Sequence, residues 1–504
     1  MEKKFYITTP LYYVNASPHI GHSYTTIAAD SLARFMRRAI GEENVWLQTG
    51  TDEYGQKIQR AALEAKCTPQ DFVDKVSVVF RDLWKGLDIS YNDFIRTTEK
   101  RHRAVVQRVL DILYKKGDIY ESQYEGWYCT PCESFWTESQ VPDQLCPDCR
   151  RAVEKITEKN YFFRLSKYQD WLISHIKGHP EFVRPAFRAN EVLSFLQMNR
   201  LEDLCISRPK ERLSWGIPLP FNQDYVTYVW FDALLNYISG VGSFDSAGVY
   251  RSQWWPADVQ LIGKDILRQH AVYWPIMLKS LNIEPPRTVF AHGWWLLGDA
   301  KMSKSKGNVV SPVEMSQKYG VDAYRYFLLR DVSFGLDGNF SEESIVKRYN
   351  GDLANDLGNL VFRTLTMVEK YYAGAVPAVD IHARKFDESG ERIKAKIQAL
   401  TQELAQAMTA ESDLNFSMGL EKIWELIGLA NKYVEETKPW NLAKENKTAQ
   451  LECFIRLLVE VIRTAAVQAG VFMPQTAQAI LDQLGSDRIR KGSPLFPRID
   501  SKKA

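Results

Sequence analysis

The sequence lacks both a long hydrophobic run and an excess of charge of one sign. No stretch approaches the roughly 20 apolar residues that a membrane-spanning helix needs, and Met1–Ile7 contain no secretory apolar segment. The 64 basic and 62 acidic residues leave a formal net charge of +2, so any nucleic-acid surface would have to be a local patch. These absences favour a cytoplasmic globular enzyme that is not bound to a membrane.

The Gly-x-Gly-x-x-Gly pattern of dinucleotide sites is also absent, although the chain begins like a parallel α/β fold. Residues 5–9 predict a short strand, and a loop bracketed by Pro10 and Pro18 leads into a helical pattern. A second strand is expected at 45–48, ending in Thr-Gly-Thr-Asp. Ligands of such sheets bind beyond the carboxyl ends of the strands, so functional residues are expected there.

At 504 residues the chain exceeds the usual limit of a single hydrophobic core, so several domains are expected. Strand-like runs resume at 224–231, 259–263 and 288–291, and helical patterns at 398–408 and 451–466 indicate bundle helices. The predicted segments are 1–115 and 216–300 for the two halves of a Rossmann-like parallel sheet, 116–215 for an insertion, 301–350 for a Lys-Met-Ser-Lys-Ser loop with linking helices, and 351–504 for an all-α helical bundle.

The first candidate phosphate site is Pro18-His19-Ile20-Gly21-His22, where the first helix is expected to begin. A proline is tolerated in the first turn, and Gly21 would leave room for a ligand against the backbone. The amino end of a helix attracts anions, and two imidazoles there could stabilise charge that builds on a phosphate. Taken alone, a His-x-x-His pair is at least as often a packing or capping pair.

The second candidate is Lys301-Met302-Ser303-Lys304-Ser305, which lies between Gly298 and Gly307. Small polar residues make this a loop that suits folding over a triphosphate, where lysine can follow and partly neutralise a phosphate. The alternative is a solvated surface loop, which is the usual meaning of scattered lysines.

With both motifs in this order, the sequence resembles the class I aminoacyl-tRNA synthetases, and among them the methionyl-tRNA synthetase family. The similarity also includes Tyr228–Ala233, Gly263–Ile266 and Gly307–Pro312. The resemblance implies that L-methionine attacks the α-phosphate of ATP, giving an aminoacyl-adenylate and pyrophosphate. The terminal ribose hydroxyl of tRNA(Met) would then attack the activated carbonyl. No carboxylate cage for Mg²⁺ is visible, so Mg²⁺ is expected to arrive with ATP.

The resemblance also implies roles for individual residues. The residues expected to stabilise the phosphate transition state are His19, His22, Lys301 and Lys304. Those expected to bind ATP are Gly21, His292, Gly293, Met302 and Lys304. The methionine pocket is expected to comprise Leu11, Tyr13, Asp52, Trp230, Ala233, Tyr237, Ile266 and His270, with Asp52 holding the α-ammonium group. The residues expected to read the CAU anticodon are Asn359, Arg363 and Trp440.

Other interpretations of some of these residues stay open. Asp52 could be a turn or cap residue. Asn359 and Arg363 could be a polar pair on a helix surface, and Trp440 could be buried. Gln269 stands where the family more often has phenylalanine, and its side chain could point away from the methionine pocket or reshape its floor.

Four of the seven cysteines form two Cys-x-x-Cys turns, Cys129 with Cys132 and Cys146 with Cys149, separated by thirteen residues. Four thiolates would close a tetrahedral zinc site with no open position, so the predicted role is structural. A redox dithiol pair would not need the second copy, and an iron–sulfur cluster fits the spacing less well than zinc does. By resemblance, the knuckle braces an insertion that meets the tRNA acceptor end.

Rival interpretations leave some of these features unexplained. The isoleucyl, valyl and leucyl enzymes insert a large editing domain between the two motifs, and residues 19–301 leave little room for one. The cysteinyl enzyme uses an active-site zinc with another ligand layout. A small-molecule nucleotidyltransferase would lack the helical tail, and a zinc-knuckle RNA-binding protein would need neither phosphate motif. Some relatives continue into a dimerisation domain after the segment matching Leu495–Ile499, so we expect a monomer.

Overall fold

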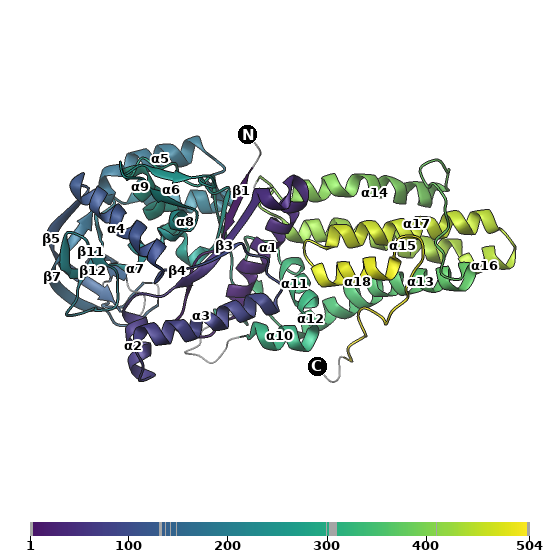
Figure 1. Cartoon of the computed structure of the whole chain (residues 1–504), viewed down its shortest axis with the longest axis horizontal. Coiled ribbons are helices and arrows are strands. Elements are labelled where there is room, and N and C mark those ends of the chain that lie inside the picture. Colours follow the sequence, from purple (N-terminus) through teal and green to yellow (C-terminus); the bar gives the residue numbers. More distant parts are fainter. Residues whose placement is uncertain are drawn as a thin grey trace. The chain divides into compact units, whose positions relative to one another are not determined.

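The structure, a computed structural model, describes residues 4–130, 134–136, 138–141, 143–147, 149–298, 300–301, 310–409 and 411–500. The chain divides into two compact units, which we call the catalytic unit and the helical unit (Figure 1). The catalytic unit comprises Met1–Lys85 and Ile89–His292, and the helical unit comprises Gly86–Asp88 and Gly293–Ala504. Across the described residues, no helix combines the length and apolarity needed to cross a membrane.

A seven-stranded sheet organises the catalytic unit, in the order β2-β3-β1-β15-β16-β8 with β4 paired to β3, and every pair is parallel. The strands are β1 (Phe5–Thr8), β2 (Tyr12–Tyr13), β3 (Val45–Asp52), β4 (Asp93–Arg96), β8 (Val183–Arg184), β15 (Val259–Gly263) and β16 (Thr288–His292). The β1–β15 pair joins segments about 250 residues apart, with Ile7 opposite Val259. The predicted Rossmann-like parallel sheet is therefore confirmed.

Helices accompany this sheet, and its central strands are buried on both faces. Ile7 on β1, Leu47 on β3 and Leu261 on β15 are fully buried. The helices of the catalytic unit are α1 (Ile20–Ile40), α2 (Gln56–Glu64), α3 (Pro69–Gly86), α4 (Lys100–Lys115), α5 (Gln169–Gly178), α6 (Ala186–Met198), α7 (Val229–Ala233), α8 (Asn236–Ser239), a π-helix (Gln269–Tyr273) and α9 (Trp274–Ser280). Helix α1 follows β1 and leads to β3, as the alternation predicted.

The strand expected at 224–231 is partly wrong. Residues Asn222–Thr227 form β12, which belongs to a separate antiparallel sheet with β10 (Ser207–Pro209) and β11 (Pro218–Leu219). The chain then turns at Tyr228 into α7, so Trp230 and Ala233 lie on a helix. A run rich in aromatic and β-branched residues suits a strand, and a five-residue helix is too short for its periodicity to show in sequence.

Within the range expected to form the insertion, a four-stranded antiparallel sheet has the order β6-β5-β7-β9. Its strands are β5 (Ile119–Cys129), β6 (Ser134–Trp136), β7 (Glu154–Phe163) and β9 (Leu204–Cys205). The same range also contributes β8 to the main sheet, where Val183 pairs with Val289. A further hairpin of the catalytic unit joins β13 (Gly242–Phe244) to β14 (Tyr250–Ser252).

The helical unit has three short strands, all before residue 340, and is otherwise almost entirely helical. The strands are β17 (Trp295–Leu297), β18 (Ala300–Lys301) and β19 (Gly338–Asn339). The helices are α10 (Pro312–Tyr319), α11 (Val321–Arg330), α12 (Glu342–Arg348), a π-helix (Tyr349–Gly358), α13 (Asn359–Tyr372), α14 (Glu388–Ala407), α15 (Phe416–Thr437), α16 (Pro439–Lys444), α17 (Thr448–Ala469) and α18 (Pro474–Leu484).

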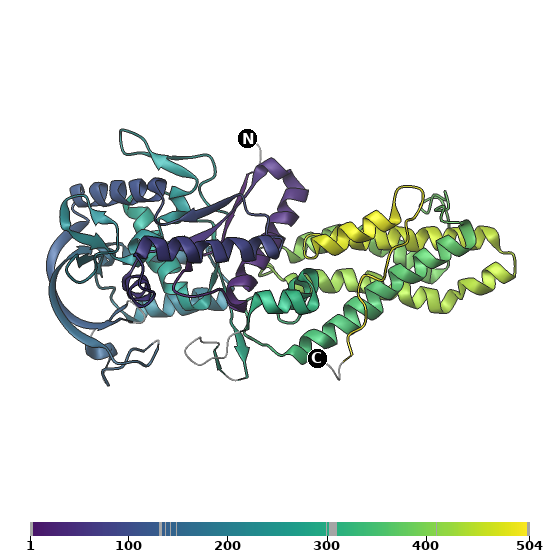
Figure 2. The same ribbon diagram turned by 60° about the horizontal axis from the view of Figure 1, so that its bottom comes forward.

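Helices α14, α15 and α17 pack side by side, as two directions of view agree (Figures 1 and 2). The apolar face expected from Leu353 to Leu365 is buried throughout. The segments predicted at 398–408 and 451–466 lie in α14 and α17, which both begin earlier than expected, and α14 ends at Ala407. The all-α bundle is therefore confirmed.

Candidate functional site

The amino end of α1 is closed by the two histidines of the first motif. His19 is the N-cap residue, and its Nδ1 accepts a hydrogen bond of 3.1 Å from the backbone N–H of Gly21. In return, Nδ1 of His22 accepts a hydrogen bond of 3.2 Å from the backbone N–H of His19. This is a reciprocal capping box, with histidines in place of the usual hydroxyl and carboxylate. Pro18 therefore lies before the cap, and the expectation that it stands in the first turn is wrong.

The capping bonds also determine where the imidazole protons lie. A neutral imidazole that accepts through Nδ1 carries its proton on Nε2. The two rings are stacked, with centroids 3.8 Å apart, so His19 and His22 hold Nε2–H donors side by side at a helix amino end. Capping and phosphate binding are thus compatible, because they use different ring nitrogens.

Gly21 is needed by the His19 ring. A Cβ atom at position 21 would lie 3.0 Å from Cε1 and 3.1 Å from Nδ1 of His19. Those distances are tighter than ordinary van der Waals contact, so a side chain there would displace the ring. The space beside Gly21, which the sequence suggested for a ligand, is therefore occupied by the His19 imidazole.

His292 ends β16 and is 4% exposed. Its Nε2 lies 2.6 Å from the hydroxyl of Thr25, and its ring packs edge-on against Tyr24 at 5.1 Å. Both partners stand on α1, within one turn after His22. The structure therefore brings His292 to the helix that carries the first motif. Thr25 was missed in the sequence, although its spacing from His22 places it on the same helix face.

The carboxyl end of β3 positions the predicted ammonium-binding residue. Asp52 is the last residue of β3, is 8% exposed, and pairs in register with Tyr13 on β2. Leu11 approaches the same strand, because a Cβ atom on Gly50 would lie 2.9 Å from its Cδ2. Three residues predicted to hold methionine thus meet at one strand end, where parallel sheets bind ligands.

A second group of predicted methionine residues surrounds His270. Its Nδ1 lies 2.8 Å from the carbonyl oxygen of Ile266 and its Nε2 lies 2.7 Å from the hydroxyl of Tyr237. The Trp230 ring stands edge-on to His270 at 6.4 Å. A carbonyl oxygen only accepts, so Nδ1–H donates to Ile266 and Nε2 accepts from Tyr237. This network joins α7, α8 and the segment 264–273, and Ala233 is buried on α7.

Burial sets the ionisation of this network. The imidazole is 2% exposed, and burial lowers the pKa of His270 to about 4. Burial likewise raises the pKa of Tyr237 well above its ordinary value. Both side chains are therefore neutral at pH 7, so a methionine pocket built on them would have an uncharged wall there, which suits a thioether.

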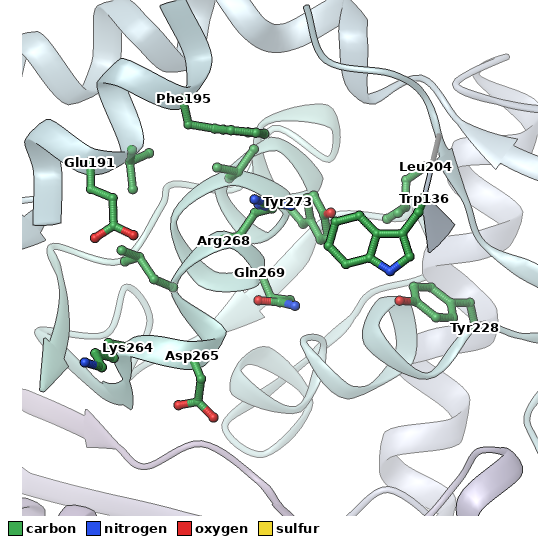
Figure 3. Close-up of a pocket in the computed structure, with 13 residues that line it drawn as sticks. Trp136, Glu191, Phe195, Leu204, Tyr228, Lys264, Asp265, Arg268, Gln269 and Tyr273 are labelled. Carbon is green, nitrogen blue, oxygen red and sulfur yellow. The ribbon is translucent and has the colours of Figure 1, made fainter. Parts of the chain in front are cut away.

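Gln269 does not belong to this network. Its side chain lines a different cavity, and none of the eight residues predicted to hold methionine is described as lining that cavity (Figure 3).

Two further candidate site residues, which the sequence did not indicate, are Tyr54 and Asp232. Both are buried, and the charges of Asp232 and Asp52 each act on the Tyr54 hydroxyl.

The second motif is described only at its start. Lys301 ends β18, where it pairs with Leu296 on β17, and Met302 and Lys304 lie outside the described residues. The backbone at Gly293, which precedes β17, packs closely against that of Leu336: a Cβ atom on residue 293 would lie 2.3 Å from it. A glycine is therefore required at position 293.

Three of the four clustered cysteines come together in the inserted sheet. The Sγ atoms of Cys129, Cys146 and Cys149 all lie within 4.8 Å of one another, and the first and last are 3.6 Å apart. Cys132 lies outside the described residues. A zinc–sulfur distance of about 2.3 Å gives tetrahedral sulfur–sulfur edges of about 3.8 Å, so the described thiols fit such an ion.

The three residues predicted to read an anticodon lie in the helical unit. Asn359 begins α13 and is exposed, and Arg363 follows one turn later with a 2.7 Å bond to Glu435. Trp440 lies on α16, directly after Pro439 at the first helical position, and is 40% exposed. The predicted helix start is therefore correct, and the indole is not a core residue.

Comparisons with known proteins agree along the chain. A family model for class I tRNA synthetases (M) matches residues 5–157 and 151–365, and a model for the anticodon-binding domain of methionyl tRNA ligase matches residues 382–494. The chain is 48% identical to a methionine–tRNA ligase of Caldanaerobacter subterraneus subsp. tengcongensis, over 100% of this chain and 80% of that protein. It is 47% identical to one of Clostridium acetobutylicum, over 99% and 79%.

Among solved structures, the chain resembles Mycobacterium tuberculosis methionyl-tRNA synthetase in complex with methionyl-adenylate. The TM-score is 0.92 at 40% sequence identity, covering 98% of this chain and 100% of that one. The apo form of the mycobacterial protein matches with a TM-score of 0.85 at 37% identity, covering 99% of each chain.

Proposed function

The chain belongs to the methionyl-tRNA synthetase family, and from that premise we propose which of its residues activate methionine and charge tRNA(Met). Its function is that of a methionine–tRNA ligase: it activates L-methionine with ATP to methionyl-adenylate and pyrophosphate, and transfers methionine to tRNA(Met). The side chain of methionine is uncharged, so the enzyme must select it by packing. The phosphate chemistry instead requires positive charges or N–H groups that are in place before the reaction.

The reciprocal histidine cap is the observation that best supports the adenylation role. His19 and His22 would donate their Nε2–H groups to the α-phosphate while the methionine carboxylate attacks it in line. The free N–H groups at the start of α1 add a positive dipole there. Because the capping bonds fix both rings before substrate binds, little reorganisation is needed as charge develops.

Part of the nucleotide site would be formed by residues on and beside α1. His292, fixed by Thr25, and Gly21 are proposed ATP contacts, together with Gly293 and Met302. Lys301 and Lys304 would neutralise the triphosphate as pyrophosphate leaves. Mg²⁺ is proposed to enter as the ATP complex, bound mainly through phosphate oxygens.

Methionine would bind with its ammonium group on Asp52 and its side chain against Leu11, Tyr13, Trp230, Ala233, Tyr237, Ile266 and His270. Asp52 suits the first role because a carboxylate at a buried strand end can pair with a cation. The neutral His270–Tyr237 pair suits the second, since a charged wall would disfavour an apolar thioether.

The cysteine cluster would hold one structural Zn²⁺, with Cys132 as the fourth ligand. Zinc would cross-link the inserted sheet. With four thiolate ligands it would have no open coordination position. Asn359, Arg363 and Trp440 would read the CAU anticodon, the exposed indole by stacking on a base and Arg363 after exchanging its bond to Glu435. A monomeric state and a cytoplasmic location stay predictions.

Methionine-dependent ATP–pyrophosphate exchange tests the proposal. Exchange should depend on methionine and should be abolished by His19→Ala or His22→Ala in protein that keeps its thermal unfolding midpoint. Exchange driven by cysteine would identify a different synthetase. Exchange without any amino acid would indicate a nucleotidyltransferase.

A further inference from the structure

A buried polar cluster adjoins Tyr237, one of the residues proposed for methionine. It consists of Tyr6 on β1, Gln48 on β3 and Asn236 at the start of α8, and we call it the amide cluster. Its three residues are at most 2% exposed. The sequence indicated none of them, because they come together only when the sheet assembles.

The Asn236 side chain joins the two short helices that carry part of the proposed methionine pocket. Its Nδ2 donates a 2.7 Å hydrogen bond to the carbonyl oxygen of Ala233, the last residue of α7. Its Oδ1 accepts a 2.9 Å hydrogen bond from Nε2 of Gln48, which also lies 3.2 Å from the Asn236 carbonyl oxygen. The turn between α7 and α8 is therefore attached to β3.

The Gln48 amide is likewise bonded at both ends. Its Oε1 accepts a 3.0 Å hydrogen bond from the Tyr6 hydroxyl, which also lies 2.9 Å from the carbonyl oxygen of Tyr237. Gly240 leaves room for this amide, because a Cβ atom on Gly240 would lie 1.8 Å from Oε1 of Gln48. The bond from Asn236 to a backbone carbonyl, which only accepts, determines the orientation of both amides.

A buried amide costs free energy unless its hydrogen bonds are formed, so a fully paired cluster favours one arrangement of the elements that it joins. The elements joined here are β1, β3, α7 and α8. The two helices carry Trp230, Ala233 and Tyr237, and the Tyr237 hydroxyl bonds His270. None of the bonds of the amide cluster described above involves a residue proposed to contact ATP.

We propose that Gln48 and Asn236 are positioning residues for methionine, which hold the turn between α7 and α8 so that the pocket has its shape before methionine binds. The proposal rests on the function proposed above, because it concerns selection of the amino acid in the first step. A pocket that is already ordered binds more tightly, since the ordering of its walls does not then oppose binding. Loss of the cluster should therefore weaken methionine binding and leave the chemistry at saturating methionine intact.

The test measures methionine-dependent ATP–pyrophosphate exchange in the 504-residue chain. Gln48→Met keeps the length of the side chain and removes its hydrogen bonds, so the methionine KM should rise about tenfold. The ATP KM, and the kcat at saturating methionine, should stay within twofold of wild type. The preference for methionine over norleucine, measured as a ratio of kcat/KM values, should fall, because a less ordered pocket distinguishes the two side chains less well.

Two further variants change the cluster from its other sides. Asn236→Leu removes the side-chain bonds to Ala233 and Gln48, and it should give the same pattern as Gln48→Met. Tyr6→Phe removes one hydroxyl and keeps the ring, so it should raise the methionine KM about threefold. As the mildest of the three changes, Tyr6→Phe tests the proposal even if the other two variants fail to fold.

Gln260→Met is the matched control. Gln260 lies on β15 of the same sheet and is fully buried, and neither polar atom of its amide has a hydrogen-bond partner among the described residues. The same substitution there removes an amide that joins no elements. It should leave the methionine KM and the preference over norleucine unchanged.

Two outcomes would overturn the inference while leaving the proposed function intact. One is a folded Gln48→Met or Tyr6→Phe protein with the wild-type methionine KM and preference. The other is an equal change of the methionine KM, the ATP KM and kcat, which would assign the amides to the stability of the fold alone. Absence of methionine-dependent exchange in the wild-type protein would instead refute the proposed function itself.

Discussion

The Tyr237 hydroxyl donates a 2.7 Å hydrogen bond to Nε2 of His270, across 33 residues of sequence. The bond leaves His270 in a single tautomer, because its Nδ1–H is already given to the Ile266 carbonyl. Tyr237 is itself held in place, since its carbonyl oxygen accepts from the Tyr6 hydroxyl on β1 at 2.9 Å. The proposed methionine pocket is thereby tied to the central strand of the sheet.

Tyr237→Phe should weaken methionine binding. The substitution keeps the ring and leaves Nε2 of His270 as a buried acceptor without its donor, a loss of about 1–3 kcal/mol. We expect the methionine KM of ATP–pyrophosphate exchange to rise about tenfold with the ATP KM unchanged. Tyr250→Phe is the matched control, because it removes the hydroxyl of a half-buried tyrosine in the same unit, which donates a 2.8 Å hydrogen bond to the Ile238 carbonyl and not to His270. Equal effects of both variants would mean a general loss of stability.

Stability should fall as the pH is lowered below about 6.5. Burial lowers the pKa of His270 to about 4 and of His102 to about 3, so both are neutral in the folded chain at a pH where the unfolded chain binds protons. The unfolded state then gains protons first, and the free energy of unfolding decreases between about pH 6.5 and 4. Chemical denaturation across this range should show the slope, and His102→Gln should reduce it. A variant with an unchanged slope would contradict the assignment.

Part of the site was predictable from the sequence because its residues are local. The histidine pair and the cysteine turns each lie within a few residues, so their spacing indicates their geometry, whereas the role expected of Asp52 came from the family resemblance. The sequence left phosphate binding and capping as alternatives for His19 and His22, and the structure shows a cap made through Nδ1 of each ring. The distinction depends on which ring nitrogen is engaged, and a sequence does not carry that information.

Other features depend on contacts between distant segments. No periodicity connects Tyr237 to His270, or Thr25 to His292, because each pair forms only when the sheet assembles. The five-residue helix α7 was mistaken for strand because its apolar run fits both structures. The direction of Gln269 likewise depends on the π-helix that begins at that residue.

Gly21→Ala should separate activity from stability. The added Cβ would press on the His19 ring at 3.0 Å, so the exchange kcat should fall about tenfold as the capping geometry is lost. Alanine favours a helix over glycine by about 1 kcal/mol, which offsets the roughly 1 kcal/mol lost with the cap, so the unfolding midpoint should stay level. Gly428→Ala, in α15 with no atom within 4 Å of the new Cβ, should raise stability without a change in activity. Normal exchange by Gly21→Ala would show that the ring position is unimportant.

Metal analysis should find about one zinc per chain in the purified protein. Cys146→Ser should lower the zinc content and the unfolding midpoint, because it removes a buried thiolate from the cluster. Cys67→Ser changes a half-buried cysteine outside the cluster and should keep both values. If the purified protein contained no zinc and Cys146→Ser kept the wild-type unfolding midpoint, a structural metal would be refuted.

Trp440→Ala should impair tRNA charging and spare amino-acid activation. The indole is 40% exposed on α16, so its removal should cost little stability, whereas loss of base stacking of about 1–3 kcal/mol should lower the charging kcat/KM roughly 10- to 100-fold. Exchange should stay within twofold of wild type, because adenylation does not use tRNA. Val467→Ala, also 40% exposed and in the same unit, should leave both activities unchanged. If Trp440→Ala lowered exchange and charging equally, the indole would be acting through the fold and not through the anticodon.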